Sequence, residues 1–207
     1  MLNIGLTGNR YSGKDKVSDL FEKISIPVFN ADVILKFIIQ YDIEVDKKIK
    51  IELGTSIYDK TGTIDPYKID DEKFKKLVDI AEKSVFEAYE RFKNKNKQTI
   101  YSIFHSSILF ECGWDKKMDF NISVFTPKVE RVERAHKQEP KLLQSTIWNL
   151  ISKEIDEVDK NKMANHVIHN YKGAIDLIKQ VDAIDQKIID TYLKNEQTSK
   201  PGKKFAL

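Results

Sequence analysis

A glycine-rich stretch near the N-terminus combines the residue types that bind phosphate. From Gly8 to Lys14 the spacing is G-x-x-x-x-G-K, preceded by an apolar segment and followed by a helical pattern. Glycines in such a loop let backbone N–H groups turn toward an anion, and the lysine reaches the outer phosphates. We therefore predict nucleotide binding by the residues of the loop, which are Gly8, Asn9, Arg10, Tyr11, Ser12, Gly13, Lys14 and Asp15.

Asp15 departs from the usual form of this motif, in which Ser or Thr follows the lysine and holds Mg²⁺. A carboxylate beside phosphates is favourable only with a cation between them, so Asp15 predicts a contact through Mg²⁺. The alternative is that Asp15 only adds negative charge to the first turn of the following helix.

Three further polar residues stand at the expected ends of strands. Asp32 follows the apolar segment 26–29 and can accept the proton of a substrate hydroxyl, although an aspartate there can also cap a helix. His105 and Glu111 follow a later apolar segment and are predicted to contact substrate, although a lone histidine is more often structural.

Arginine is rare in this chain, which makes its positions informative. Of 35 basic residues, only Arg10, Arg91, Arg131 and Arg134 are arginines. Forked recognition of phosphate favours arginine over lysine. Arg131 and Arg134 are three positions apart, so one helical face is predicted to present both to the phosphates, whereas Arg91 is most simply a surface charge.

The elements that must position these residues alternate along the chain. Buried strands alternating with helices predict an α/β fold, a three-layer sandwich with a five-stranded parallel sheet. Ligands of such sheets bind beyond the carboxyl ends of the strands, where the polar residues collect. Strands are expected at 4–6, 26–29, 99–104, 120–125 and 166–169, and helices at 14–24, 33–41, 42–53, 70–94, 128–139, 142–155 and 174–193.

The remaining segments and the composition set the limits of the prediction. A polar stretch at 154–162 is expected before the last strand, Trp148 is expected in the core, and the tail 194–207 is expected to be disordered. A net charge of +3 from 35 basic and 32 acidic residues gives no nucleic-acid signature. A single cysteine, Cys112, fits a reducing cytoplasm, and neither a membrane span nor a leader is expected.

Five segments of the chain follow one another in the order of five known motifs. The segments are 4–14, 26–32, 60–66, 107–111 and 164–173. The motifs are I-G-L-T-G-x-x-x-S-G-K, I-x-V-I-D-A-D, D-G-x-I-D-R, P-L-L-F-E and A-D-x-V-I-x-N-x-G. In these motifs and their order, the chain resembles the dephospho-coenzyme A kinases.

This resemblance implies a P-loop kinase fold and a particular reaction. A single domain (1–207) would contain acceptor-binding helices at about 33–95 and a helical lid at about 128–160. The γ-phosphate of ATP would pass to the ribose 3′-hydroxyl of dephospho-coenzyme A, a small-molecule acceptor. The implied roles are a general base for Asp32, phosphate binding for Lys14 and Arg134, and a place near adenine for Asn170 and Gly173.

Departures from the family motifs leave two alternatives open. The chain differs at Asp15, Asn30, Pro66, Ser107 and Asn165. Its G-K-D sequence is similar to the loop of the deoxynucleoside monophosphate kinases of tailed phages, so a nucleoside monophosphate is the alternative acceptor. A third hypothesis is a nucleotide-binding regulator without turnover. The chain retains both a phosphate-binding lysine and a candidate base, which argues against this hypothesis.

Overall fold

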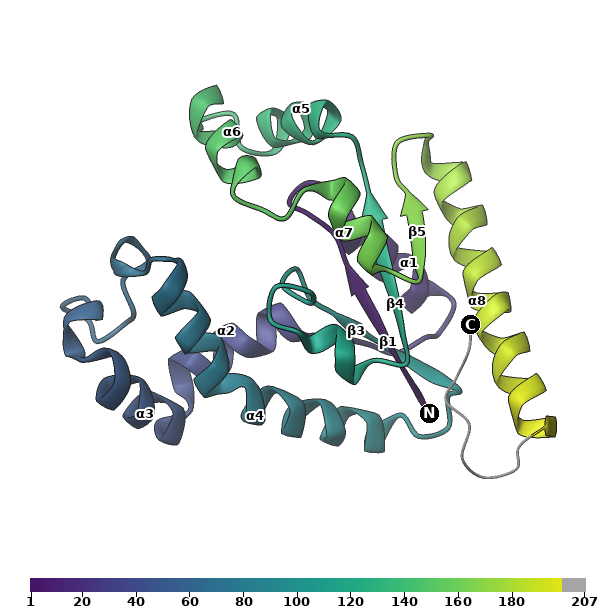
Figure 1. Ribbon diagram of the computed structural model, residues 1–207, viewed down its shortest axis with the longest axis horizontal. Helices are drawn as coiled ribbons and strands as arrows, with labels where there is room; N and C mark the ends of the chain where they lie inside the picture. Colours follow the sequence, from purple (N-terminus) through teal and green to yellow (C-terminus); the bar gives the residue numbers. More distant parts are fainter. Residues whose placement is uncertain (199–207) are drawn as a thin grey trace. The chain divides into compact units, whose positions relative to one another are not determined.

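The computed structural model, which describes residues 1–198, contains a five-stranded sheet (Figure 1). The strands have the order β2-β3-β1-β4-β5, and β1 pairs in parallel with β3 and β4, as β4 does with β5. This confirms the predicted α/β class and its five strands. Their bounds are β1 Leu2–Thr7, β2 Val28–Asn30, β3 Tyr101–His105, β4 Phe120–Phe125 and β5 His166–His169.

The chain divides into two compact units, one formed by residues 1–29 with the chain from 97 onward, the other by residues 30–96. The first unit contains helices α1 (Lys14–Lys23), α5 (Lys128–Gln138), α6 (Gln144–Ser152), α7 (Glu157–Met163) and α8 (Ala174–Thr198). The second contains α2 (Ala31–Tyr41), α3 (Ile43–Leu53) and α4 (Asp71–Lys95). The expectation of a single domain with acceptor-binding helices stays a prediction.

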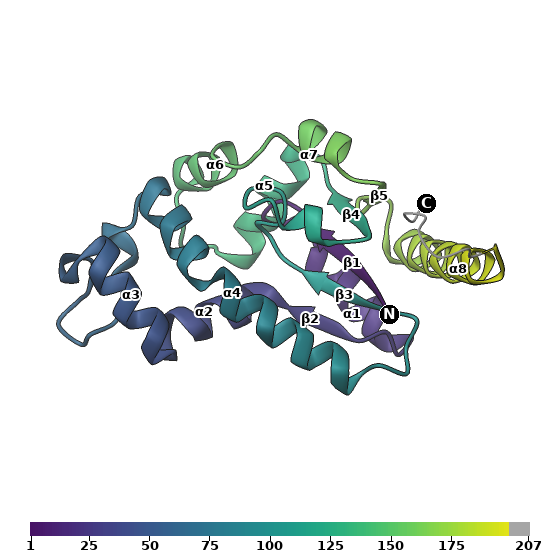
Figure 2. The same ribbon diagram turned by 60° about the horizontal axis from the view of Figure 1, so that its bottom comes forward.

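The core of the first unit lies between the sheet and the helices α1 and α8. The three central strands, β3, β1 and β4, are buried almost continuously, as expected when both faces of a parallel sheet are covered, whereas β2 and β5 are partly exposed. Helix α1 contributes Val17 and Phe21, and α8 contributes residues at helical spacing, namely Leu177, Val181, Ile184 and Ile188. Figures 1 and 2 show α1 and α8 as neighbours beside the sheet, whereas α7 packs against β4.

The second unit is helical. Helix α3 begins directly after Asp42, whose carboxylate accepts hydrogen bonds from the backbone N–H groups of Glu44 and Val45. The long helix α4 is capped in the same way by Asp70. The three helices pack on one another, and their buried apolar residues include Leu35, Ile38, Ile49, Leu77 and Val78.

Two local features differ from what residue type alone indicates, and one of them makes an expectation wrong. The polar stretch 154–162 contains helix α7, which begins after its cap Asp156 and whose buried position is occupied by Lys160 rather than by an apolar residue. Trp148, expected in the core, is 38% exposed and lies under the ammonium of Lys128, 5.3 Å from the ring centre. A sequence pattern that equates burial with apolar character misses both cases.

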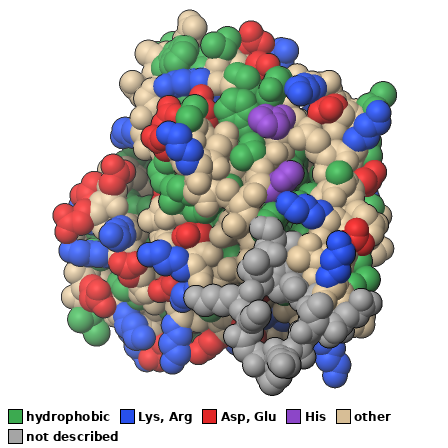
Figure 3. Space-filling model, turned by 45° about the vertical axis from the view of Figure 1, so that its right-hand side comes forward, with side chains coloured by type: hydrophobic (Ala, Val, Ile, Leu, Met, Phe, Trp, Pro, Cys, Tyr) green, Lys and Arg blue, Asp and Glu red, His purple; other side chains and the backbone are tan. Residues whose placement is uncertain are grey.

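The C-terminal helix, the helix lengths and the surface add three observations. Helix α8 continues through 194–198, which were expected to be disordered, and residues 199–207 of that expected tail lie outside the described residues. No helix within residues 1–198 is long and apolar enough to cross a membrane. On the face shown in Figure 3, basic and acidic side chains are intermixed. The expected absence of a nucleic-acid partner stays a prediction.

Candidate active site

The glycine loop joins β1 to α1, and its two motif glycines are required by close packing. Gly13 has a φ of +81°, a left-handed conformation that glycine adopts at little cost. A Cβ atom at Gly13 would collide with the side-chain amide nitrogen of Asn170, and one at Gly8 would lie 2.9 Å from the carbonyl oxygen of Val124. Tyr11 also has a positive φ, +61°, and such strain in a residue other than glycine is typical of functional loops.

The loop opens onto a cleft suited to an anion. The cleft measures about 340 Å³ and is lined by the loop, the first residues of α1 and one face of α5. No side chain caps the N-terminus of α1, so its first N–H groups and the positive end of its dipole are available to a ligand. The ammonium of Lys14 lies at the same end, with its side chain 15% exposed. This arrangement is suited to phosphate, and phosphate binding by these residues stays a prediction.

Asp15 lies beside two cationic or potentially cationic groups. Its carboxylate is 4.0 Å from the ammonium of Lys14 and 3.4 Å from Nε2 of His105, which is buried at the end of β3. The other ring nitrogen of His105 contacts the hydroxyl of Ser18 at 3.4 Å. The side chain of Asp15 is 76% exposed, so its outer face can meet a cation that also contacts phosphate.

The donor atoms around the loop fit Mg²⁺ only in combination with a bound nucleotide. Among residues 1–198, no group of three or more histidine, cysteine or acidic side chains could hold a metal ion. Mg²⁺ in kinases is held by one or two carboxylates together with phosphate oxygens and water, and a single exposed carboxylate at the loop agrees with that pattern.

Arg134 reaches the loop from α5, and its guanidinium lies against backbone carbonyl groups. It donates hydrogen bonds to the carbonyl oxygens of Tyr11 (3.3 Å), Ser12 (3.2 Å) and Asn170 (2.5 Å). One face of α5 thereby joins the phosphate loop to the loop that follows β5. The predicted contact of Arg134 with ATP phosphates stays a prediction.

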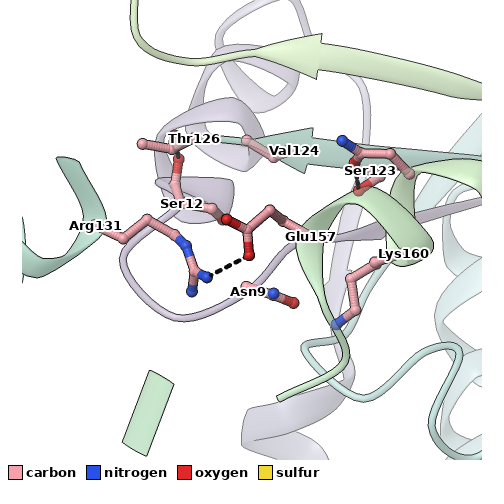
Figure 4. Close-up of a pocket in the computed structure, with 9 residues that line it drawn as sticks. Asn9, Ser12, Ser123, Val124, Thr126, Arg131, Glu157 and Lys160 are labelled. Atoms are coloured by element: carbon pink, nitrogen blue, oxygen red, sulfur yellow. Dashed lines mark hydrogen bonds and ion pairs between the residues drawn. The ribbon is translucent and has the colours of Figure 1, made fainter. Parts of the chain in front are cut away.

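Arg131 is buried in an ion cluster behind the loop. Its guanidinium, 1% exposed, lies 2.9 Å from the carboxylate of Glu154, and it donates to the carbonyl oxygen of Arg10. The carboxylate of Glu157 lies 3.0 Å from the same guanidinium (Figure 4). Glu154 also accepts a hydrogen bond from the backbone N–H of Arg10 at 2.8 Å. Arg131 therefore contacts the loop from behind; its predicted contact with the nucleotide stays a prediction.

Glu111 is paired with a residue that sequence reasoning missed. The ammonium of Lys160, 2% exposed, lies 2.7 Å from the carboxylate of Glu111 and 3.3 Å from the carbonyl oxygen of Ser107. One lysine among many in a charged stretch gives no signal that it is buried. The pair connects α7 to the segment after β3, and the predicted substrate contacts of Glu111 and His105 stay predictions.

The structure also shows where three other polar residues lie, namely Asn30, Asp32 and Asn165. Asn30, and not Asp32, caps α2, because its side-chain oxygen accepts the backbone N–H of Val33 at 3.1 Å. Asp32 lies in the first turn of α2, so the alternative that it is the cap is wrong, and its role as a base stays a prediction. The side-chain oxygen of Asn165 accepts the backbone N–H of Asn121, a bond that an aspartate would make equally well.

The glycine loop connects the first strand to its helix in a parallel sheet, and additional helices lie over the loop. These features define the class of P-loop phosphotransferases. The chain belongs to the dephospho-CoA kinase family, whose sequence model matches residues 2–176. The resemblance found in the motifs is thus confirmed, and membership of a kinase family makes the chain an ATP-using enzyme rather than a regulator without turnover.

Individual relatives agree with this assignment. The dephospho-CoA kinase of Aquifex aeolicus is 29% identical over 91% of this chain and 98% of its own length. That of Fusobacterium nucleatum is 30% identical over 89% of this chain and 97% of its own. The crystal structure of TT1252 from Thermus thermophilus has the same fold, with a TM-score of 0.75 and 22% identity over 90% of this chain and 97% of that one.

Proposed function

We propose that this protein is a dephospho-CoA kinase, which transfers the γ-phosphoryl group of ATP to the ribose 3′-hydroxyl of dephospho-coenzyme A. The observation that carries the proposal is the anion-binding cleft at the N-terminus of α1, in a chain that the family's sequence model matches over residues 2–176. Relatives that match along nearly their whole length carry the same name. We further propose that the enzyme works on this small-molecule acceptor in the cytoplasm.

In the proposed reaction the 3′-oxygen of the acceptor forms a bond to the γ-phosphorus as the bond from that phosphorus to the leaving ADP oxygen breaks. Asp32 takes the hydroxyl proton. The loop N–H groups and Lys14 hold the phosphates, and Arg134 stabilises the charge of the group in transfer. In this proposal the backbone of the loop after β5, at Asn170 and Gly173, lies near adenine, whereas the side-chain amide of Asn170 is bonded to the carbonyl oxygen of Ser12.

Mg²⁺ completes the proposed site. When bound, it would neutralise charge on the β- and γ-phosphate oxygens. Asp15 would contact the ion directly or through water, and His105 would hold the Asp15 carboxylate in place from the end of β3. Glu111 would orient substrate on the same side of the sheet.

The acceptor is tested by measuring ATP turnover against a panel of dephospho-coenzyme A, the deoxynucleoside monophosphates and no acceptor. Turnover with dephospho-coenzyme A alone supports the proposal. Turnover with a nucleoside monophosphate would replace it by the phage-type alternative, which the family match does not favour.

The general base is tested by Asp32→Asn. We expect loss of nearly all turnover with ATP affinity close to that of the unmodified protein, because the carboxylate acts on the acceptor hydroxyl. Asp71→Asn is the matched control, since Asp71 is an exposed aspartate in the first turn of another helix of the same unit. Wild-type activity of Asp32→Asn would show that the base is a different group.

A further inference from the structure

Three side chains from separate elements donate hydrogen bonds to one carbonyl oxygen in the phosphate loop. The oxygen belongs to Ser12 and accepts from the side-chain amide of Asn170 (2.7 Å), the hydroxyl of Thr126 (2.9 Å) and the guanidinium of Arg134 (3.2 Å). Asn170 follows β5, Thr126 follows β4, and Arg134 lies on α5. We call the first two side chains, those of Asn170 and Thr126, the carbonyl clamp.

The carbonyl clamp is buried and has little freedom to move. Thr126 is 1% exposed and Asn170 is 8% exposed. The single hydroxyl proton of Thr126 is shared between the carbonyl oxygens of Ser12 and Asn170, which lie 2.9 and 3.0 Å from the hydroxyl oxygen, so Thr126 also contacts the backbone at Asn170. A carbonyl oxygen has only two lone pairs, which makes three donors on one oxygen an unusual concentration of hydrogen bonds.

Fixing this carbonyl determines where the next N–H group points. The structure has no cis peptide bond within the described residues, and in a trans peptide the C=O and N–H groups point in opposite directions. Holding the Ser12 carbonyl toward β4 and β5 therefore turns the N–H of Gly13 the other way. Gly13 lines the cleft at the start of α1, where the anion is expected.

We propose that Asn170 and Thr126 are positioning residues for phosphate binding, which hold the Ser12 carbonyl so that the Gly13 N–H faces the nucleotide phosphates. This inference rests on the proposed use of the loop for ATP. It gives Asn170 a role in phosphate affinity that differs from contact with adenine. The requirement for glycine at position 13 follows, because any Cβ there would displace the Asn170 amide.

The test uses inorganic tripolyphosphate, which offers the phosphates of ATP without its base, together with ATP and adenosine. Titration calorimetry on the full chain compares Asn170→Ala and Thr126→Val with the unmodified protein. We expect Asn170→Ala to weaken tripolyphosphate and ATP by the same factor, about five- to tenfold, and Thr126→Val by about threefold. Adenosine affinity should not change.

Two controls separate loss of a donor from general loosening of the structure. Gln180→Ala removes two hydrogen bonds to the backbone of His169, next to Asn170, and leaves both donors of the carbonyl clamp in place. It should keep tripolyphosphate affinity within about twofold. Thr126→Ser retains the hydroxyl and should recover most of the loss seen in Thr126→Val, even if Asn170→Ala does not fold.

Three results would overturn the inference. The first is tripolyphosphate affinity that survives Asn170→Ala and Thr126→Val while adenosine affinity falls, which would place Asn170 at the base. The second is an equal loss in Gln180→Ala. The third is an unmodified protein that does not bind tripolyphosphate. Failure of the proposed function has a different signature, which is tripolyphosphate and ATP binding with no turnover of dephospho-coenzyme A.

Discussion

Replacement of Arg131 by methionine tests the ion cluster behind the phosphate loop. The change keeps much of the side-chain volume and leaves the carboxylates of Glu154 and Glu157 without the cation that lies 2.9 and 3.0 Å from them. Removing one partner of a buried ion pair costs about 3–5 kcal/mol. The two glutamate side chains are 16% and 18% exposed, so water screens part of this cost. We expect a loss of about 2–4 kcal/mol.

The assay is thermal unfolding without nucleotide, followed by circular dichroism. For a chain of this size each kcal/mol corresponds to about 2–4 °C, so Tm should fall by roughly 5–15 °C. Arg91→Met is the matched control, because Arg91 is exposed on α4 and its loss should change stability by less than about 0.5 kcal/mol.

A triple variant separates charge from packing. Combining Arg131→Met with Glu154→Gln and Glu157→Gln removes all three charges, while the amide introduced at position 154 keeps an oxygen for the N–H of Arg10. We expect this variant to regain most of the lost stability and to bind ATP about as tightly as the unmodified protein. A triple variant no more stable than the single one would refute the electrostatic explanation. Recovered stability with weak ATP binding would instead assign Arg131 a direct contact with phosphate.

Three further predictions concern other titratable residues. Asp15→Ala should reduce the gain in ATP affinity that Mg²⁺ provides, measured by titration with and without the metal. An unchanged gain would mean that Asp15 only adds negative charge to the first turn of α1. Lys160→Met should lower the free energy of unfolding in urea by about 2–4 kcal/mol because Glu111 loses its cation, and adding Glu111→Gln should restore most of it. Burial, with smaller effects of nearby charges, lowers the pKa of His166 from 6.5. As the pH falls, His166 therefore binds a proton in the unfolded chain before it does so in the folded protein. The free energy of unfolding should decrease as the pH drops through 6.5, and more steeply in the unmodified protein than in His166→Asn.

Local patterns were sufficient for much of the fold and for the loop. Short apolar segments predicted the strands. The spacing of a few consecutive residues predicted the glycine loop, because the backbone conformation of such a loop requires glycine at fixed positions. Asn30 shows the limit of such reasoning even nearby. A polar residue before a helix predicts a cap, but Asn30 and Asp32 both qualified, and only the backbone at Asn30 places a side-chain oxygen over the N–H of Val33.

The sequence by itself determined a phosphate-binding loop in a parallel α/β sheet, because the loop motif and each strand consist of residues that are adjacent in the chain. Only the tertiary structure decided what supports that loop. From its sequence context Lys160 would be a surface charge, but in the structure α7 places it in a buried position beside Glu111. The carbonyl oxygen of Ser12 accepts a hydrogen bond from Asn170, which is 158 positions away in the chain. Contacts between residues so distant in the chain depend on how strands are ordered and helices packed. No local pattern of residue types records that order.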